Sequence, residues 1–138
     1  FDTETNQSYV PYVVETSIGL DRLFLLTLCN AYEEQDLSTD EKQDSRTVLH
    51  LHPALAPVKA AIFPLTKKDG LPEKAREIMD RLKFEFSLQY DEKDSIGKRY
   101  RRQDAIGTPC CITVDHQTLE DNMVTVRDRD TMLQHRNI

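Results

Sequence analysis

The hydrophobic positions near the amino terminus change their spacing once, and this change predicts a strand followed by a helix. Residues 9–14 are rich in aromatic and β-branched side chains, a composition typical of a buried strand. From Gly19 onward, apolar residues recur at helical spacing and predict a helix with one apolar stripe. Glu15 and Ser17 lie between the two elements, and Arg22 falls in the first helical turn. These side chains could reach a ligand, although by spacing alone the commoner roles are a Ser17 helix cap and solvated charges.

The second part of the chain alternates more regularly between strand and helix patterns. We predict a strand at 58–63, a helix at 72–83, a strand at 84–91, a basic helix at 95–106, strands at 109–115 and 122–128, and a helix at 129–136. This order predicts an α/β fold with a mixed, mostly parallel sheet of about five strands flanked by helices. The strands at 109–115 and 122–128 should close the sheet as an antiparallel hairpin.

An acidic segment separates these two parts. Residues 33–46 contain six acids, two bases and one large apolar residue, Leu37, which predicts a linker or mobile loop. Charge changes here as well: residues 1–47 hold ten acids and three bases, a net charge of −7, whereas residues 48–138 hold fourteen acids and fifteen bases, a net charge of +1. We therefore expect domains at 1–32 and 48–138, joined by a linker at 33–47.

Composition narrows the class of protein. Hydrophobic residues make up 38% and charged residues 30% of 138 residues, as in water-soluble globular proteins, and no apolar run approaches the length of a membrane span. We expect no membrane partner and no signal peptide, since the first residues are polar. The odd cysteine count and the lack of zinc-ligand spacing predict no metal site and buried thiols in a reducing cytoplasm. The cysteines are Cys29, Cys110 and Cys111.

Basic residues are concentrated late in the chain, although the whole chain has a net charge of −6. Five of them fall within ten residues, and two more follow near the carboxy terminus. Such clusters can neutralise phosphates even in an acidic protein. They are Lys93, Lys98, Arg99, Arg101 and Arg102, followed by Arg127 and Arg129.

The junction near Glu15 resembles a known catalytic motif. The segment VVETSIGLDRL (residues 13–23) is similar to motif 3 of the class II aminoacyl-tRNA synthetases, and most similar to the form found in glycyl-tRNA synthetases. It departs from that form at Thr16, where the family usually has proline. The resemblance implies that residues 1–32 are a strand–helix remnant of an antiparallel catalytic domain.

Later segments resemble the carboxy-terminal anticodon-binding domain of the same family. SIGKRYRRQDAIGTPCCITVD (residues 95–115) and VTVRDRDTMLQHR (residues 124–136) match its characteristic patterns, and LHPALAPVKAAIFPL (residues 51–65) matches as well. The resemblance covers nearly the whole chain except the acidic segment. It implies that single-stranded anticodon bases of tRNA(Gly) are read by stacking and hydrogen bonding, with basic residues on the phosphates.

The resemblance also implies roles for individual residues in a parent enzyme that joins glycine to tRNA with ATP and Mg²⁺. Glu15 would bind the ammonium group of glycine, Ser17 would help to hold it, and Arg22 would bind ATP. The tRNA-binding candidates are Lys98, Arg99, Arg101, Arg102, Arg127 and Arg129. Structural roles stay open for Arg99, and for Arg127 and Arg129, which could instead pair with Asp128 and Asp130.

The family resemblance further implies a homodimeric parent, with catalytic motifs 1 and 2 upstream of this segment. We therefore expect the chain alone to be inactive and to hold neither ATP nor Mg²⁺. One alternative is a non-catalytic synthetase-like module that binds RNA or protein, which would have no need of Glu15, Ser17 and Arg22. A flavodoxin-like nucleotide-binding protein also fits the alternating elements, but the chain has no Gly-rich phosphate loop.

Overall fold

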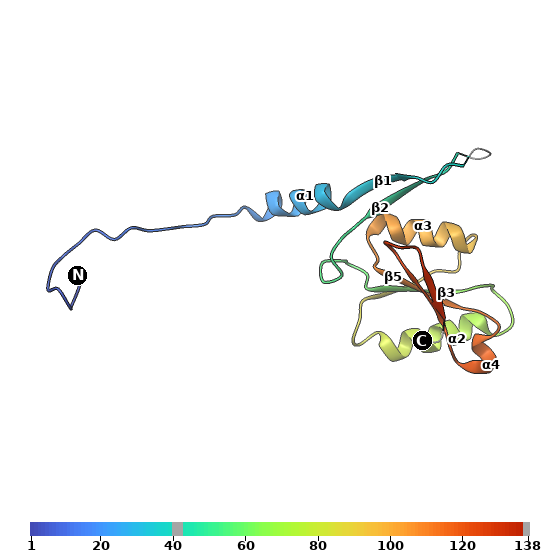
Figure 1. The fold of residues 1–138 in the computed structure, drawn as a ribbon. Helices are drawn as coiled ribbons and strands as arrows, with labels where there is room; N and C mark the ends of the chain where they lie inside the picture. Colours follow the sequence, from blue (N-terminus) through green and yellow to red (C-terminus); the bar gives the residue numbers. More distant parts are fainter. Residues whose placement is uncertain (40–42, 137–138) are drawn as a thin grey trace.

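A mixed β-sheet organises the carboxy-terminal part of the chain (Figure 1). Its strands are β3 (Ala60–Pro64), β4 (Leu88–Tyr90), β5 (Cys110–Val114), β6 (Thr125–Asp128) and β7 (Gln134–Arg136). The computed structural model describes residues 1–39 and 43–136, and among these the five strands follow the order β4-β3-β5-β6-β7. β3 is parallel to β4 and β5, whereas β6 is antiparallel to β5 and β7. The predicted mixed sheet of about five strands flanked by helices is confirmed, although it is not mostly parallel, since two strand pairs are parallel and two are antiparallel.

Helices cover both faces of this sheet. Successive residues of a strand point to opposite faces, so the continuous apolar run of β3 places hydrophobic side chains on both faces, and each face must be covered. On one face, α2 (Leu71–Leu82) packs Leu71 and Ala75 against Ile62. On the other face, α3 (Ile96–Ile106) packs Tyr100 against Phe63, with the two rings edge to face at 5.7 Å. Every residue of β3 is buried, which explains its continuous apolar sequence.

The helix predicted at residues 129–136 is wrong. The chain turns after β6 and returns as β7, with Val126 opposite His135. The Asp128 carboxylate accepts hydrogen bonds from the backbone N–H groups of Asp130 and Thr131, at 3.0 and 2.8 Å. This carboxylate offers the backbone an alternative to helical hydrogen bonds, so the turn prevails over the apolar spacing.

Two other elements also differ from their predicted bounds. The predicted strand at 84–91 shortens to β4, because residues 84–87 continue from the end of α2, where the Phe86 N–H donates to the Leu82 carbonyl at 3.0 Å. A four-residue helix, α4 (Thr118–Asp121), occupies the turn expected between β5 and β6. Asp115 initiates it by accepting hydrogen bonds from the N–H and hydroxyl groups of Thr118.

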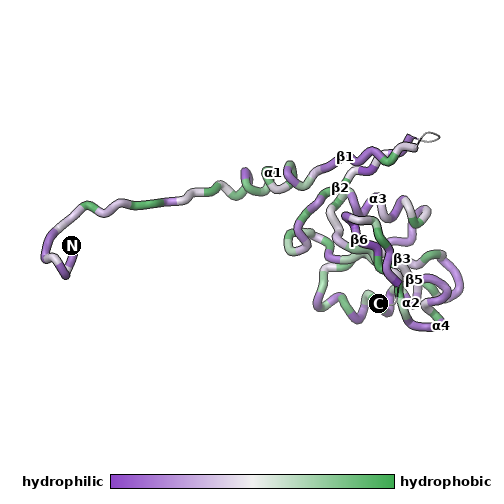
Figure 2. Tube along the Cα trace, in the orientation of Figure 1, coloured by the Kyte–Doolittle hydropathy of each residue, from purple (hydrophilic) through white to green (hydrophobic). Residues whose placement is uncertain are grey.

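The amino-terminal segment differs from the predicted strand. Residues 9–14 are exposed and pair with no strand of the described residues, whereas the predicted helix is present as α1 (Leu20–Ala31). Figure 2 shows that hydrophobic residues lie along this extended segment and along α1. A strand requires a neighbour to satisfy its backbone groups, and apolar composition alone does not supply one.

The acidic segment is better ordered than predicted. β1 (Tyr32–Asp36) and β2 (Ser45–Leu49) form an antiparallel hairpin beside α3, so the loop predicted at 33–47 is wrong for these strand residues. Residues 40–42 of that prediction lie outside the described residues. Alternation along β2 buries Arg46 and Val48, while the acids of β1 stay at the surface. Because β2 extends from residue 45 to 49, the predicted boundary at residue 48 falls inside a strand.

The three cysteines have different environments. Cys111 in β5 is buried, and burial raises the pKa of its thiol to about 12. Burial also raises the pKa of the partly buried Cys110. Cys29 on α1 is exposed, so the prediction of a buried thiol is confirmed for Cys111 and wrong for Cys29.

Two glycines at helix ends can be compared, since Gly70 comes directly before α2 and Gly107 directly after α3. Both have positive φ angles, +82° and +78°. A Cβ atom at Gly107 would lie 2.9 Å from Leu51 Cδ1 and 3.0 Å from the Leu49 carbonyl, whereas nothing lies within 4 Å of one at Gly70. We expect Gly70→Ala to lower the free energy of unfolding by about 1–2 kcal/mol through backbone strain.

Gly107→Ala should lower it by about 1–3 kcal/mol more, because the new methyl group overpacks the contact with β2 and Leu51. Urea denaturation of both variants measures the difference. Equal losses of stability would contradict the close approach at Gly107.

Candidate functional site

Arg99, on the first half of α3, is a buried side chain with 3% of its surface exposed. Its guanidinium donates hydrogen bonds to the carbonyl oxygens of Pro64 at 2.6 Å and Asp94 at 2.8 Å. It also donates to the carbonyls of Glu92 and Lys93, at 3.4 and 3.3 Å. The structure therefore gives Arg99 the structural role left open above: it joins the loop after β3 to the loop after β4.

Arg127 is also directed into the protein. Its two Nη groups form a bidentate ion pair with the carboxylate oxygens of Asp104 on α3, at 2.9 and 3.1 Å. Its guanidinium carbon lies over the Tyr100 ring, 4.7 Å from the ring centroid. The alternative of a pair with Asp128 is wrong, because consecutive residues of β6 point to opposite faces of the sheet. Strand alternation could have excluded that pair, but it could not have identified Asp104 as the partner.

Asp104 also forms an ion pair with a second buried arginine, Arg46, which comes from the hairpin of β1 and β2. Arg46 of β2 is 1% exposed, and its Nε lies 3.4 Å from Asp104 Oδ2. Its guanidinium also donates to the Arg129 carbonyl at 2.5 Å. Burial lowers the pKa of Arg46, and the Asp104 carboxylate opposes that shift. Asp104 therefore holds cations from β2 and β6 against α3, a pairing that the sequence did not indicate.

Arg129 pairs with its neighbour, as the alternative reading of the sequence proposed. Its Nε and Nη2 donate to the two Asp130 carboxylate oxygens at 2.8 and 2.9 Å, and Nη1 donates to the carbonyls of Leu51 and Gly107. Hydrogen bonds from Arg129, and secondarily from His50, lower the pKa of Asp130. His50 is itself placed between Asp130 and Glu33, at 2.6 and 2.7 Å.

Arg101 and Arg102 are partly exposed, but each already has acidic partners. Arg101 binds Asp44 at 2.8 Å and the Ser45 carbonyl at 2.6 Å, beside the hairpin. Arg102 binds Asp91 at 2.7 Å and Asp94 at 2.9 Å. Partial burial raises the pKa of Asp91, but hydrogen bonds from the Lys93 N–H group and from Arg102 outweigh it, so the net shift is downward.

Lys98 differs from the arginines around it. It is exposed, and it forms no ion pair within the part of the chain that the structure describes. Among the six predicted tRNA-binding side chains, three are buried and two are paired with acids at the surface. A phosphate would therefore meet Lys98 without first displacing a carboxylate.

The residues of the motif 3 resemblance lie apart from this cluster. Glu15 and Ser17 belong to the exposed extended segment, and Arg22 is exposed on the first turn of α1. None of the main cavities of the described residues is lined by them. Residues 1–39 and 43–136 also contain no group of three or more His, Cys, Asp or Glu side chains suited to a metal ion.

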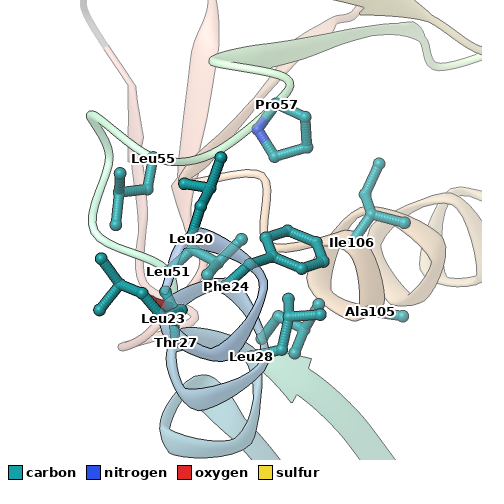
Figure 3. Close-up of a pocket in the computed structure, with 11 residues that line it drawn as sticks. Leu20, Leu23, Phe24, Thr27, Leu28, Leu51, Leu55, Pro57, Ala105 and Ile106 are labelled. Carbon is teal, nitrogen blue, oxygen red and sulfur yellow. The ribbon is translucent and has the colours of Figure 1, made fainter. Parts of the chain in front are cut away.

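An apolar groove lies where α1 meets the carboxy-terminal part. The cavity is about 560 Å³, and Figure 3 shows Phe24 of α1 near Ile106 of α3, with Leu51 beside them. This lining is mostly hydrocarbon, and the hydroxyl that it contains, that of Thr27, already donates a hydrogen bond to the Leu23 carbonyl at 2.8 Å. No helix among the described residues has the length and hydrophobicity that crossing a bilayer requires.

Replacing Asp104 by Asn tests the buried ion cluster. The change leaves the guanidinium groups of Arg46 and Arg127 buried without a counter-charge, so we expect the free energy of unfolding to fall by about 3–5 kcal/mol. Asp80→Asn is the control, since Asp80 and its partner Lys83 are exposed, and it should cost less than about 1 kcal/mol. Similar losses in both variants, measured by urea denaturation, would contradict this role for Asp104.

Comparisons with known proteins agree with the fold. The family described as "Anticodon binding domain" matches residues 59–137, from the start of β3 to just beyond β7. The chain is 61% identical over 136 residues to the "Glycine--tRNA ligase" of Clostridium perfringens, covering 98% of this chain and 29% of that protein. It is 58% identical over 135 residues to the protein of that name from Staphylococcus haemolyticus, covering 98% and 28%, and 54% identical over 136 residues to that from Agathobacter rectalis, covering 99% and 29%.

The chain thus spans less than a third of the length of these curated relatives. Its similarity to them extends over the hairpin and α1 as well as the sheet, since at least 98% of the chain is aligned. The match to the family covers more than half of the chain and includes every strand of the mixed sheet. The chain therefore belongs to the anticodon-binding domain family.

Proposed function

We propose that this chain is the anticodon-binding part of a glycine–tRNA ligase, together with the end of its catalytic domain. The observation that carries the proposal is the identity of 54–61% to proteins named glycine–tRNA ligase over nearly the full chain. Residues 48–138 would then form the anticodon-binding domain, of which 137–138 lie outside the described residues. Residues 1–32 would belong to the catalytic domain.

The parent protein would activate glycine with ATP and Mg²⁺ and transfer it to tRNA(Gly), as a homodimer in the cytoplasm. Glu15 and Ser17 would contact glycine, since a carboxylate suits its ammonium group. Arg22 would contact ATP, because a planar guanidinium pairs with phosphate and stacks on adenine. These residues are exposed, and they line none of the main cavities within residues 1–39 and 43–136. The chain alone would therefore bind tRNA without activating glycine.

The binding part of this proposal is tested with two RNAs that differ only in the anticodon. We expect the 138-residue chain to bind tRNA(Gly) at least about tenfold more tightly than the same tRNA with its anticodon bases exchanged. A wrong base leaves the protein group that reads its edge without a hydrogen-bond partner, which costs about 1–3 kcal/mol. Filter binding at one fixed salt concentration measures both affinities. Equal affinities would contradict anticodon recognition.

The inactivity of the chain is tested by ATP–pyrophosphate exchange in the presence of glycine and Mg²⁺. We expect no exchange above background, because Glu15, Ser17 and Arg22 lie on an exposed segment that holds no substrate in place. The glycine–tRNA ligase of Clostridium perfringens serves as the positive control. Exchange by the chain at a comparable rate would show that these residues suffice for glycine activation.

A further inference from the structure

We propose that lysines at one edge of the sheet, rather than the arginines of α3, hold the phosphates of the bound tRNA. Two of them follow β3, one follows β4, and one lies in the first turn of α3. We call this set the lysine edge: Lys67, Lys68, Lys93 and Lys98. The inference rests on the proposed function, because it assigns the phosphate contacts of that same binding event.

The topology brings these lysines to one side of the molecule. β3 and β4 are parallel neighbours, with Ile62 opposite Tyr90, so their carboxyl ends lie at the same edge. From that edge the chain enters α2 on one face of the sheet and α3 on the other face. The loops after β3 and β4 therefore diverge, and in open α/β sheets ligands bind where such loops separate.

Arg99 fixes these loops next to each other. One of its Nη groups donates to Pro64 at the end of β3, and the other donates to Asp94 after β4. The guanidinium is buried beneath the loops and supplies no charge to solvent. Its effect is to hold Lys67 and Lys68 on one loop near Lys93 on the other, in a preorganised surface.

The acids of the loops after β3 and β4 have contacts of their own, which leaves the four lysines without a competing carboxylate partner. Arg102 binds Asp91 and Asp94, while Glu92 accepts a hydrogen bond from the Tyr90 hydroxyl at 2.5 Å. Asp69 lies 3.9 Å from His116. All members of the lysine edge are exposed, and none forms an ion pair within residues 1–39 and 43–136. The edge can thus attract a polyanion although the chain as a whole is acidic.

The chemistry of this edge suits phosphates better than bases. Its aromatic residue, Tyr90, is half-buried, with Arg76 over its ring at 5.3 Å. The exposed rings of Phe84 and Phe86 precede β4 and so lie toward the opposite edge. Ammonium groups without a stacking platform contact the RNA backbone regardless of sequence. The lysine edge therefore contributes affinity, and anticodon discrimination must come from other side chains.

The test compares pairs of substitutions with equal changes in charge. Lys67→Gln with Lys68→Gln, and Lys93→Gln with Lys98→Gln, each remove two positive charges from the lysine edge. Arg81→Gln with Lys83→Gln is the matched control, because these residues lie near the end of α2 and already pair with Glu77 and Asp80. The affinity of each 138-residue variant for tRNA(Gly) is measured between 50 and 200 mM salt, where phosphate contacts dominate the salt dependence.

We expect each lysine-edge pair to weaken binding about tenfold at 50 mM salt and to reduce the slope of log K against log salt by about two. The control pair should leave both quantities unchanged. Preference for tRNA(Gly) over the anticodon-exchanged tRNA should persist in every variant, because phosphate contacts carry no sequence information. Unchanged thermal unfolding of the variants would confirm that only surface charge was altered.

The outcomes separate this inference from the proposed function. Wild-type binding that prefers tRNA(Gly), combined with an unchanged salt slope in both lysine-edge pairs, would overturn the lysine edge alone. A loss of anticodon preference in these pairs without a change of slope would also overturn it, since the lysines would then be reading bases. Failure of the wild-type chain to bind or to prefer tRNA(Gly) would instead overturn the proposed function.

Discussion

The buried carboxylate of Asp104 is the contact on which the arrangement of the surrounding elements depends. It binds Arg127 of β6 and lies beside Arg46 of β2, while its own element is α3. Burying these charges is costly, so the ion cluster adds less to stability than its short distances suggest. Any arrangement that separated the hairpin or β6 from α3 would leave a buried charge unpaired. The cluster therefore restricts how these three elements can pack, and Arg46 connects the acidic hairpin to the sheet.

The burial of arginines in ion pairs and hydrogen bonds also explains why we place the phosphate-binding surface at the lysine edge. Arginine forms several directed hydrogen bonds from one planar group, which suits the joining of carbonyls and carboxylates inside a fold. Arg99, Arg127 and Arg129 are used in this way, and they organise the loops from beneath. Lysine carries a compact, strongly hydrated charge, and the two lysines of the basic cluster, Lys93 and Lys98, remain at the surface. A basic sequence cluster is thus divided by the fold into structural arginines and exposed lysines.

Patterns that depend on local spacing were predicted well. The apolar stripe of α2, the basic helix α3 and the buried strands β3 and β5 follow from helix and strand periodicity alone. The predictions at residues 129–136 and 33–47 did not survive, because turn hydrogen bonds at Asp128 and the burial of Arg46 and Val48 outweighed local propensity. The strand at residues 9–14 also required a neighbouring strand, which composition cannot specify.

The sequence by itself determined the α/β class, the order of most elements and the family, since hydrophobic periodicity and motif segments are properties of neighbouring residues. Only the tertiary structure decided which basic side chains are available to a ligand. Arg127 and Arg129 lie two residues apart, yet their partners come from α3 and from the loops at Leu51 and Gly107, far away in the chain. Burial and ion pairing depend on such long-range contacts, and for that reason Lys67 and Lys68 become candidates only once the carboxyl ends of β3 and β4 are seen to lie side by side.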